Sequence, residues 1–168
     1  AFYVGVYEVT NEEFMAFVEA GGYRSSEYWS ADGWQHVRFF QDSTEQAGPQ
    51  FWQNGRFPEG QERMPVYGVC FYEAEAFAKW AGYRLPTSTE WEVAASLDPK
   101  GAKETYPWGN EFDIKAGNFG PAALAVGSKQ GDKSDFGCFD MAGNLMEWTF
   151  DPVPMDGHQP FSLKGGAY

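Results

Sequence analysis

The spacing of apolar and polar residues changes several times along this chain, and each change predicts a different element. Residues 2–7 alternate as a half-buried strand does. Thr10 and Glu13 follow as a T-x-x-E capping box, which satisfies the free amide donors at the start of a helix. Phe14 and Phe17 then recur at helical spacing. The opening of the chain therefore predicts a strand followed by a helix that ends at two glycines, residues 21–22.

The pattern further along the chain predicts one more strand and two more helices. Residues 66–71 are an apolar run of strand length, and residues 73–81 carry apolar positions three and four apart. A second capping box begins at Thr87, and Trp91, Ala94 and Ala95 mark the buried face of the helix that it opens. Residues 164–168 have the composition of the beginning of a final strand.

Between residues 23 and 63 no period holds. A loop of this length in a compact domain is usually either functional or fixed by its own side chains. Trp29, Trp34 and Trp52 lie within it, and such aromatic anchors favour the second interpretation. Beyond Ser96 most of the chain is also expected to be loop.

Composition changes this picture in two ways. The 15 Phe, 9 Tyr and 7 Trp residues predict a core of packed rings, while 20 Gly and 10 Pro residues interrupt long regular elements. A net charge of -12 argues against nucleic acid or an anionic membrane surface as a partner, because both select basic patches. No stretch approaches the apolar length of a membrane span.

The residues from 82 to 92, Gly-Tyr-Arg-Leu-Pro-Thr-Ser-Thr-Glu-Trp-Glu, closely resemble the R-L-P-T-E-x-E-W-E signature of the formylglycine-generating enzyme family, also called the sulfatase-modifying factor family. The stretch from Gly21 to Trp52 is in addition similar to a loop of ergothioneine-type sulfoxide synthases, which share this domain. Further blocks that resemble the family, in the same order, are residues 7–11, 65–74, 106–110, 117–118, 137–149 and 164–168.

The resemblance implies an α+β fold, the C-type-lectin-like fold of formylglycine-generating enzymes, rich in loops and with few regular elements. It implies one domain over residues 1–168, and we expect that domain to be incomplete at both ends. Ala78 and Ala95 stand where eukaryotic members carry disulfide cysteines, so the chain resembles bacterial or archaeal members.

The family's redox centres do not match residues of this chain. Formylglycine-generating enzymes hold copper with two cysteines that follow the R-G-G-S-W block, and the sequence ends where that segment would begin. Cys70 and Cys138 match neither position. Sulfoxide synthases use iron held by three histidines of a separate helical domain, whereas His36 and His158 have no spaced partners. Copper or iron is therefore expected only from segments outside this chain.

The resemblance does imply a structural calcium site in the late acidic loop. Calcium selects carboxylate and carbonyl oxygens, which a tightly curled loop supplies. An alternative is a capped turn in which Asp140 accepts backbone amides. A second family site begins at positions matching Asn118 and Phe119, but its later ligands have no clear counterpart here. The ligands implied for the first site are Asp140, Gly143, Leu145 and Glu147.

Three functions remain open at this stage. The first is a domain related to oxidases that convert a protein cysteine to formylglycine, with its catalytic cysteines outside this chain. The second is a non-catalytic lectin-like binding or assembly module, since a fold does not fix a function. The third is a fragment of an iron-dependent sulfoxide synthase. For all three we expect a protein or peptide partner, possible assembly with other chains and an extracytoplasmic location, where calcium is abundant.

Overall fold

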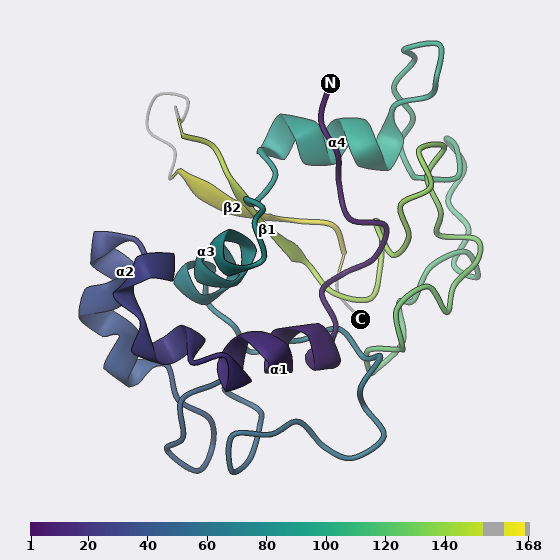
Figure 1. Cartoon of the computed structure of the whole chain (residues 1–168). Coiled ribbons are helices and arrows are strands. Elements are labelled where there is room, and N and C mark those ends of the chain that lie inside the picture. The colour runs from purple at the N-terminus through teal and green to yellow at the C-terminus, as the bar shows by residue number, and fades with distance from the viewer. Residues whose placement is uncertain (153–159, 167–168) are drawn as a thin grey trace. The chain divides into compact units, whose positions relative to one another are not determined.

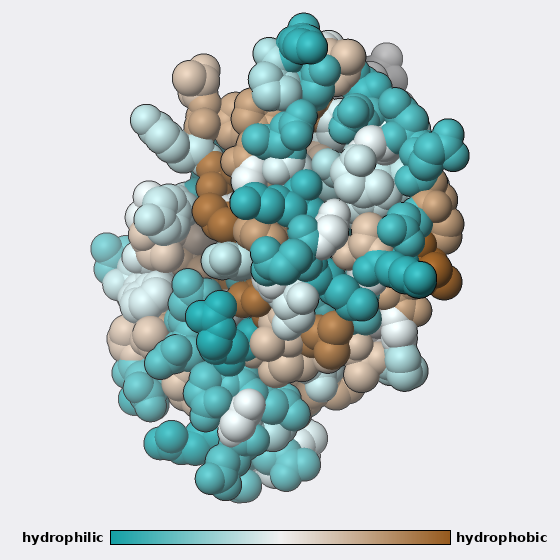
Figure 2. Space-filling view, turned by 90° about the vertical axis from the view of Figure 1, so that its right-hand side faces the viewer, coloured by the Kyte–Doolittle hydropathy of each residue, from teal (hydrophilic) through white to brown (hydrophobic). Residues whose placement is uncertain are grey.

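The computed structural model describes residues 1–152 and 160–166 (Figure 1). Its backbone divides into two compact units, one of Val9–Leu85 and one that combines Ala1–Glu8 with Pro86–Tyr168. The expected organisation as one domain stays a prediction. Within the described residues, no helix is both long enough and apolar enough to cross a membrane. On the face drawn in Figure 2, hydrophilic residues predominate and hydrophobic residues form small groups between them.

The unit of Val9–Leu85 is helical. Its α-helices are α1 (Asn11–Glu19), α2 (Ala31–His36) and α3 (Phe71–Trp80), and short 3-10 turns cover residues 22–24, 26–28 and 37–39. The Thr10–Glu13 capping box is formed in both directions, so the predicted start of α1 is confirmed. The third helix begins two residues earlier than predicted, because Cys70 and Glu73 form a capping box of their own.

Aromatic rings fill the core of this unit, as the composition predicts. The ring of Phe17 packs against several other aromatic rings. Its centroid lies 5.5 Å from that of Phe14 and 5.6 Å from that of Tyr23, which are usual distances for packed aromatic pairs. A Cβ on Gly22 would lie 2.1 Å from the Phe17 ring, so only glycine fits there. The buried residues of this cluster are Phe14, Phe17, Tyr23, Trp29, Trp52 and Ala76.

The long aperiodic segment is fixed by its own side chains. The Trp29 indole donates a 2.8 Å hydrogen bond to the carbonyl of Gly22, and the Trp52 indole donates one of 3.2 Å to Asn11. The segment also contains α2 and the 3-10 turns, which its sequence does not predict. These elements are too short to show a period, and tertiary packing on the buried rings holds them.

Two predicted strands are wrong. In residues 2–7, the carbonyl of Val6 accepts a hydrogen bond from the amide of Phe139. In residues 66–71, the amide of Val66 donates a hydrogen bond to the carbonyl of Val9. Neither segment forms a strand ladder. An apolar run acquires strand structure only when a partner strand lies beside it over several residues, and these runs meet single backbone groups instead.

The second unit carries α4 (Ser88–Ser96) and two strands. The helix begins at the predicted capping box of Thr87, and its predicted inner residues Trp91, Ala94 and Ala95 are buried. Strand β1 (Glu147–Phe150) pairs antiparallel with β2 (Phe161–Lys164), with Glu147 opposite Lys164. The predicted strand at 164–168 is therefore displaced: β2 ends at Lys164, and residues 167–168 lie outside the described residues.

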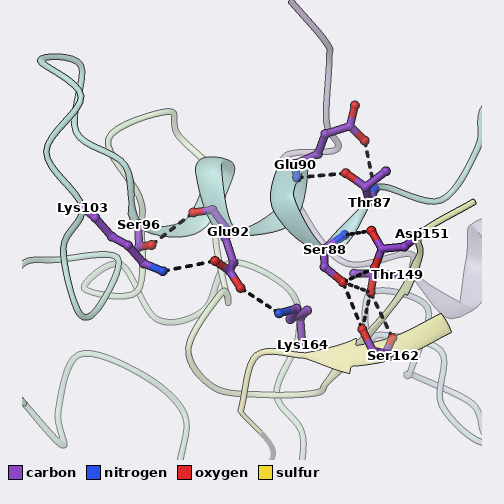
Figure 3. A network of polar contacts seen from close by, with 10 residues as sticks. All are labelled: Thr87, Ser88, Glu90, Glu92, Ser96, Lys103, Thr149, Asp151, Ser162 and Lys164. Carbon is purple, nitrogen blue, oxygen red and sulfur yellow. Dashed lines mark hydrogen bonds and ion pairs between the residues drawn. The ribbon is translucent and has the colours of Figure 1, made fainter. Parts of the chain in front are cut away.

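A polar network joins the start of α4 to the strand pair (Figure 3). The Ser88 amide and hydroxyl donate to the two oxygens of Asp151 at 3.0 and 2.6 Å. The hydroxyls of Ser88, Thr149 and Ser162 lie within 3.2 Å of one another. The helices, the small sheet and the long loops together make a loop-rich α+β structure.

Candidate functional site

Carboxylates organise the loop in which the sequence predicts calcium. Asp132 accepts hydrogen bonds from the amides of Ala142, at 3.1 Å, and Gly143, at 3.0 Å. Glu8 accepts the amide of Leu145 at 3.0 Å. Neither acid is a predicted site residue. Asp132 thus binds two consecutive backbone N–H groups of the turn, and Glu8 binds one backbone N–H group together with the Asn144 side chain at 2.7 Å.

The two asparagines of this region hold the loop against a second turn. The Asn144 amide donates to the carbonyl of Asn118, and the Asn118 side chain donates to the Asn144 side chain, both at 2.9 Å. A Cβ on Gly143 would lie 2.6 Å from the Asn118 carbonyl oxygen, so glycine is required for this approach. Asn118 thus lies beside the predicted loop, whereas the ring of Phe119 packs on Phe112.

Asp140 is buried and adopts a left-handed backbone conformation, with φ of 61°. Its carboxylate accepts the Gly127 amide at 2.6 Å, and its own amide donates to the Asp132 carbonyl at 3.0 Å. Burial raises the pKa of Asp140. The Asp140 carboxylate therefore caps a turn, as the alternative interpretation of the sequence expects. Calcium binding by Asp140 stays a prediction.

Glu147 and Trp91 carry the orphaned polar atoms of the site. The Oε2 atom of Glu147 and the Nε1 atom of Trp91 are both buried, and neither makes a hydrogen bond of good geometry. The Trp91 side chain nevertheless lies close enough to Glu147 to lower its pKa slightly. Burial raises the pKa of Glu147 well above its usual value, and the nearby charge of Glu8 adds to the effect. A buried carboxylate oxygen without a partner is costly unless a proton or a cation neutralises it.

Burial has the same effect on two other acids beside this loop, Glu8 and Asp132. Burial raises the pKa of Glu8 to about 8, against the hydrogen bond from Asn144. Burial also raises the pKa of Asp132 to about 6. Within residues 1–152 and 160–166, no three or more His, Cys, Asp or Glu side chains are grouped to hold a metal ion. The predicted calcium site needs only two carboxylates, so it stays a prediction.

A cavity of about 690 Å³ opens beside Trp91. Four segments of the same unit form its walls: α4, the loop at residues 103–107, residues 141–142 and the glycines at 165–166. Its volume lies in the range of small-molecule sites. The lining combines rings with polar groups, chiefly Trp91, Tyr106, Met141, Glu92, Lys103 and Glu104.

Glu92 links two of these walls (Figure 3). Its carboxylate accepts from Lys164 of β2 at 2.8 Å and from Lys103 of the neighbouring loop at 3.1 Å. The hydrogen bonds from Lys164 and Lys103 lower the pKa of Glu92. Because the three side chains are partly exposed, each ion pair is worth at most about 1 kcal/mol. The bridge orients the cavity rim more than it stabilises the fold.

The cysteines and histidines show no redox centre in the described part of the chain. Both thiols are free. Burial, and then the charge of Glu73, raise the pKa of Cys70 to about 12, and burial raises that of Cys138. Thiolates are the form that binds copper, so both environments oppose it. His36 is exposed and bonds the Asp32 carbonyl, and His158 lies outside the described residues.

With this geometry established, comparison with known proteins shows the family. The model of the sulfatase-modifying factor enzyme 1-like domain matches residues 1–168, and the chain belongs to this family. The resemblance inferred from the sequence blocks is thereby confirmed. The proteins similar to this chain include both an oxygenase and a protein that is named as inactive.

Three relatives show the range of proteins that carry similar domains. Hercynine oxygenase of Mycobacterium tuberculosis is 40% identical over 95% of this chain and 40% of its own length. Serine/threonine-protein kinase Pkn1 of Chlamydia trachomatis is 36% identical over 99% of this chain and 25% of its own length. The inactive C-alpha-formylglycine-generating enzyme 2 of Mus musculus is 29% identical over 99% of this chain and 63% of its own length. The chain thus spans about two fifths of the hercynine oxygenase.

Proposed function

We propose that this chain is the sulfatase-modifying-factor part of a larger oxygenase that acts on a small sulfur-containing or sulfur-accepting substrate. The observation that carries the proposal is its 40% identity to a hercynine oxygenase along 95% of the chain. The C-type-lectin-like form of the fold belongs to the same proposal. In the longer protein, iron held by residues outside this chain would supply oxygen activation.

The cavity beside Trp91 is the place where this chain would contribute to substrate binding. It is the larger of the two described cavities, at about 690 Å³ against 370 Å³. The Trp91 and Tyr106 side chains offer apolar contact, while Glu92 and Lys103 offer charges on its rim. These groups can orient a small polar substrate and exclude water from one side of it.

The test uses the complete protein, loaded with iron, and measures oxygen consumption with hercynine and a small thiol as substrates. Glu104→Trp would fill part of the cavity and is expected to raise KM for hercynine. Glu111→Trp changes an exposed glutamate that does not line the cavity, and serves as the matched control. Oxygen consumption that does not depend on hercynine or the thiol would refute the proposal.

A non-catalytic binding or assembly module is the second candidate. It is favoured by the relative named as inactive, which is similar over 99% of this chain, and by the raised pKa of both thiols. Conversion of a protein cysteine to formylglycine would require a cysteine pair outside this chain. For both candidates we still expect a protein or peptide partner, possible assembly with other chains, a bacterial source and an extracytoplasmic location.

We include a structural calcium ion in the proposal. Asp140 and Glu147 would supply carboxylate oxygens, and Gly143 and Leu145 would supply carbonyls. The Oε2 atom of Glu147 supports this assignment, because it is buried and makes no hydrogen bond of good geometry. The second predicted site, at Asn118 and Phe119, stays a prediction. An ion there would compete with two hydrogen bonds, because the Asn118 Oδ1 atom accepts the Gly120 amide at 3.2 Å and the Asn118 carbonyl accepts the Asn144 amide.

A further inference from the structure

The one Asn-Gly pair of the sequence, Asn54–Gly55, forms the tip of a tight hairpin. Gln53 and Arg56 exchange backbone hydrogen bonds of 2.9 and 3.0 Å on either side of it. The φ angles of Asn54 and Gly55 are 54° and 70°, which is the arrangement of a type I′ turn. Asn54 is exposed to solvent.

Asn-Gly pairs have a characteristic chemical weakness. The glycine nitrogen loses its proton and attacks Cγ of the asparagine side chain, a C–N bond forms, and ammonia leaves. Water then opens the cyclic imide to aspartate or isoaspartate. No oxidant or reductant takes part, and glycine offers no Cβ to hinder the attack. Exposed asparagines are among the thermolabile residues of proteins for this reason.

In this chain the attacking nitrogen is engaged by a buried carboxylate. The Gly55 N–H donates a 2.7 Å hydrogen bond to Oδ2 of Asp42, whose exposed fraction is 5%. Oδ1 of Asp42 accepts the amides of Thr44, at 2.7 Å, and Gln46, at 3.0 Å. The Asp42 side chain is thereby fixed, and it cannot follow Gly55 if the hairpin tip moves.

A second link holds the other residue of the pair. The Thr44 hydroxyl accepts the Asn54 amide at 2.7 Å and donates to Asp42 at 2.7 Å. Burial acts to raise the pKa of Asp42, but the hydrogen bonds from Gly55, Thr44 and Gln46 outweigh it and leave the pKa lowered. Asp42 is therefore ionised at neutral pH, and it is too weak a base to remove the amide proton.

We propose that Asn54–Gly55 is a deamidation site held unreactive by Asp42. The carboxylate holds the Gly55 N–H by a charge-assisted hydrogen bond, and its negative charge opposes loss of the proton. Imide formation requires the hairpin to open from both Asp42 and Thr44. Isoaspartate would add one atom to the main chain and displace Gly55 from Asp42, so the modification would also free this loop. The inference is independent of the proposed function.

The test follows deamidation by peptide mapping and mass spectrometry of the complete protein during prolonged incubation at neutral pH. We expect folded wild-type protein to deamidate at Asn54 at least about tenfold more slowly than urea-unfolded protein, since opening must break a hydrogen bond to a charged group. In folded Asp42→Asn protein, the rate of deamidation at Asn54 is expected to rise most of the way to the rate in unfolded protein. The wild-type comparison remains decisive if this variant does not fold.

Two controls separate local protection from general destabilisation. Tyr23→Phe removes a buried hydrogen bond of the same unit without touching the hairpin, and should leave the Asn54 rate unchanged. Thr44→Val removes only the second link and should give a smaller acceleration than Asp42→Asn. Equal rates in folded and unfolded wild type, slower deamidation in Asp42→Asn, or equal acceleration by Tyr23→Phe would each overturn the proposal.

Discussion

The phenol of Tyr23 donates a 2.5 Å hydrogen bond to the carboxylate of Glu73, and both side chains are buried. The other oxygen of Glu73 accepts the amide of Cys70 at 2.7 Å, at the start of α3. Burial raises the pKa of Glu73 despite both hydrogen bonds, and burial together with Glu73 raises the pKa of Tyr23. The acid thus joins the 3-10 turn at residues 22–24 to a helix 50 residues further along the chain.

Tyr23→Phe should destabilise the protein. The substitution leaves a buried carboxylate oxygen without its donor, which costs about 1–3 kcal/mol. Urea unfolding measures the loss. Tyr28→Phe is the matched control, because the Tyr28 ring also packs on Phe17 but is only partly buried, and it should cost less than about 0.5 kcal/mol. Equal losses in the two variants would contradict this account of Glu73.

Cys70 should be unreactive although it is partly exposed. Its pKa of about 12, against a usual value of 9.0, keeps it as the thiol where an ordinary cysteine ionises. In a Cys138→Ser background, iodoacetamide at mildly alkaline pH should modify folded protein at least about tenfold more slowly than unfolded protein, because the thiolate is the reactive form.

The same shift has a consequence for stability. The unfolded thiol loses its proton near 9 and the folded thiol only near 12, so the unfolded state binds fewer protons in this interval. The free energy of unfolding should therefore fall as pH rises between these values. Cys70→Ser should make the dependence on pH shallower. An unchanged slope would show that Cys70 does not titrate in this way.

Gly165→Ala should cost more than Gly137→Ala. The two glycines have nearly the same backbone conformation, with φ of 85° and 87°. A Cβ at Gly137 meets nothing within 4 Å, whereas one at Gly165 would lie 2.7 Å from Oε2 of Glu147. Gly137→Ala should cost about 1–2 kcal/mol for the left-handed backbone alone. A larger loss in thermal or urea unfolding for Gly165→Ala would measure the clash with Glu147.

Calcium should stabilise the unit that contains Glu147. Binding to the folded state alone raises the melting temperature as ion concentration increases. We expect a lower melting temperature in excess chelator than in calcium, and no difference between the two conditions for Asp140→Ala. Asp98→Ala removes a partly buried acid that caps another loop of this unit, and should keep the calcium response. If the melting temperature of the wild-type protein is the same in excess chelator as in calcium, the proposed calcium site is wrong.

The helix starts at Thr10 and Thr87 were predictable because a capping box joins residues only three apart. The predicted strands at 2–7 and 66–71 failed for the opposite reason. A strand depends on a partner strand that can lie anywhere in the chain. The apolar run itself does not indicate whether that partner is present. Strands β1 and β2 do pair, but each has only four residues, and the alternation of apolar and polar residues over that length is too short to be recognised.

The candidate site shows the same division. The family blocks led to Asp140 and Glu147, but not to Glu8, which bonds the Leu145 amide 137 residues further along the chain. Asp132 and Asp42 likewise carried no signal, since an acid in a loop is usually solvated. Only the path of the folded chain decides which backbone amides such an acid meets.

The sequence by itself therefore determined the family, the ring-packed core and the local helix signals, all of which depend on residue type and short spacing. Tertiary structure decided how the long loops are held and which carboxyls are buried. It also decided where the cavity opens, because these features arise from contacts between segments that are distant in the chain.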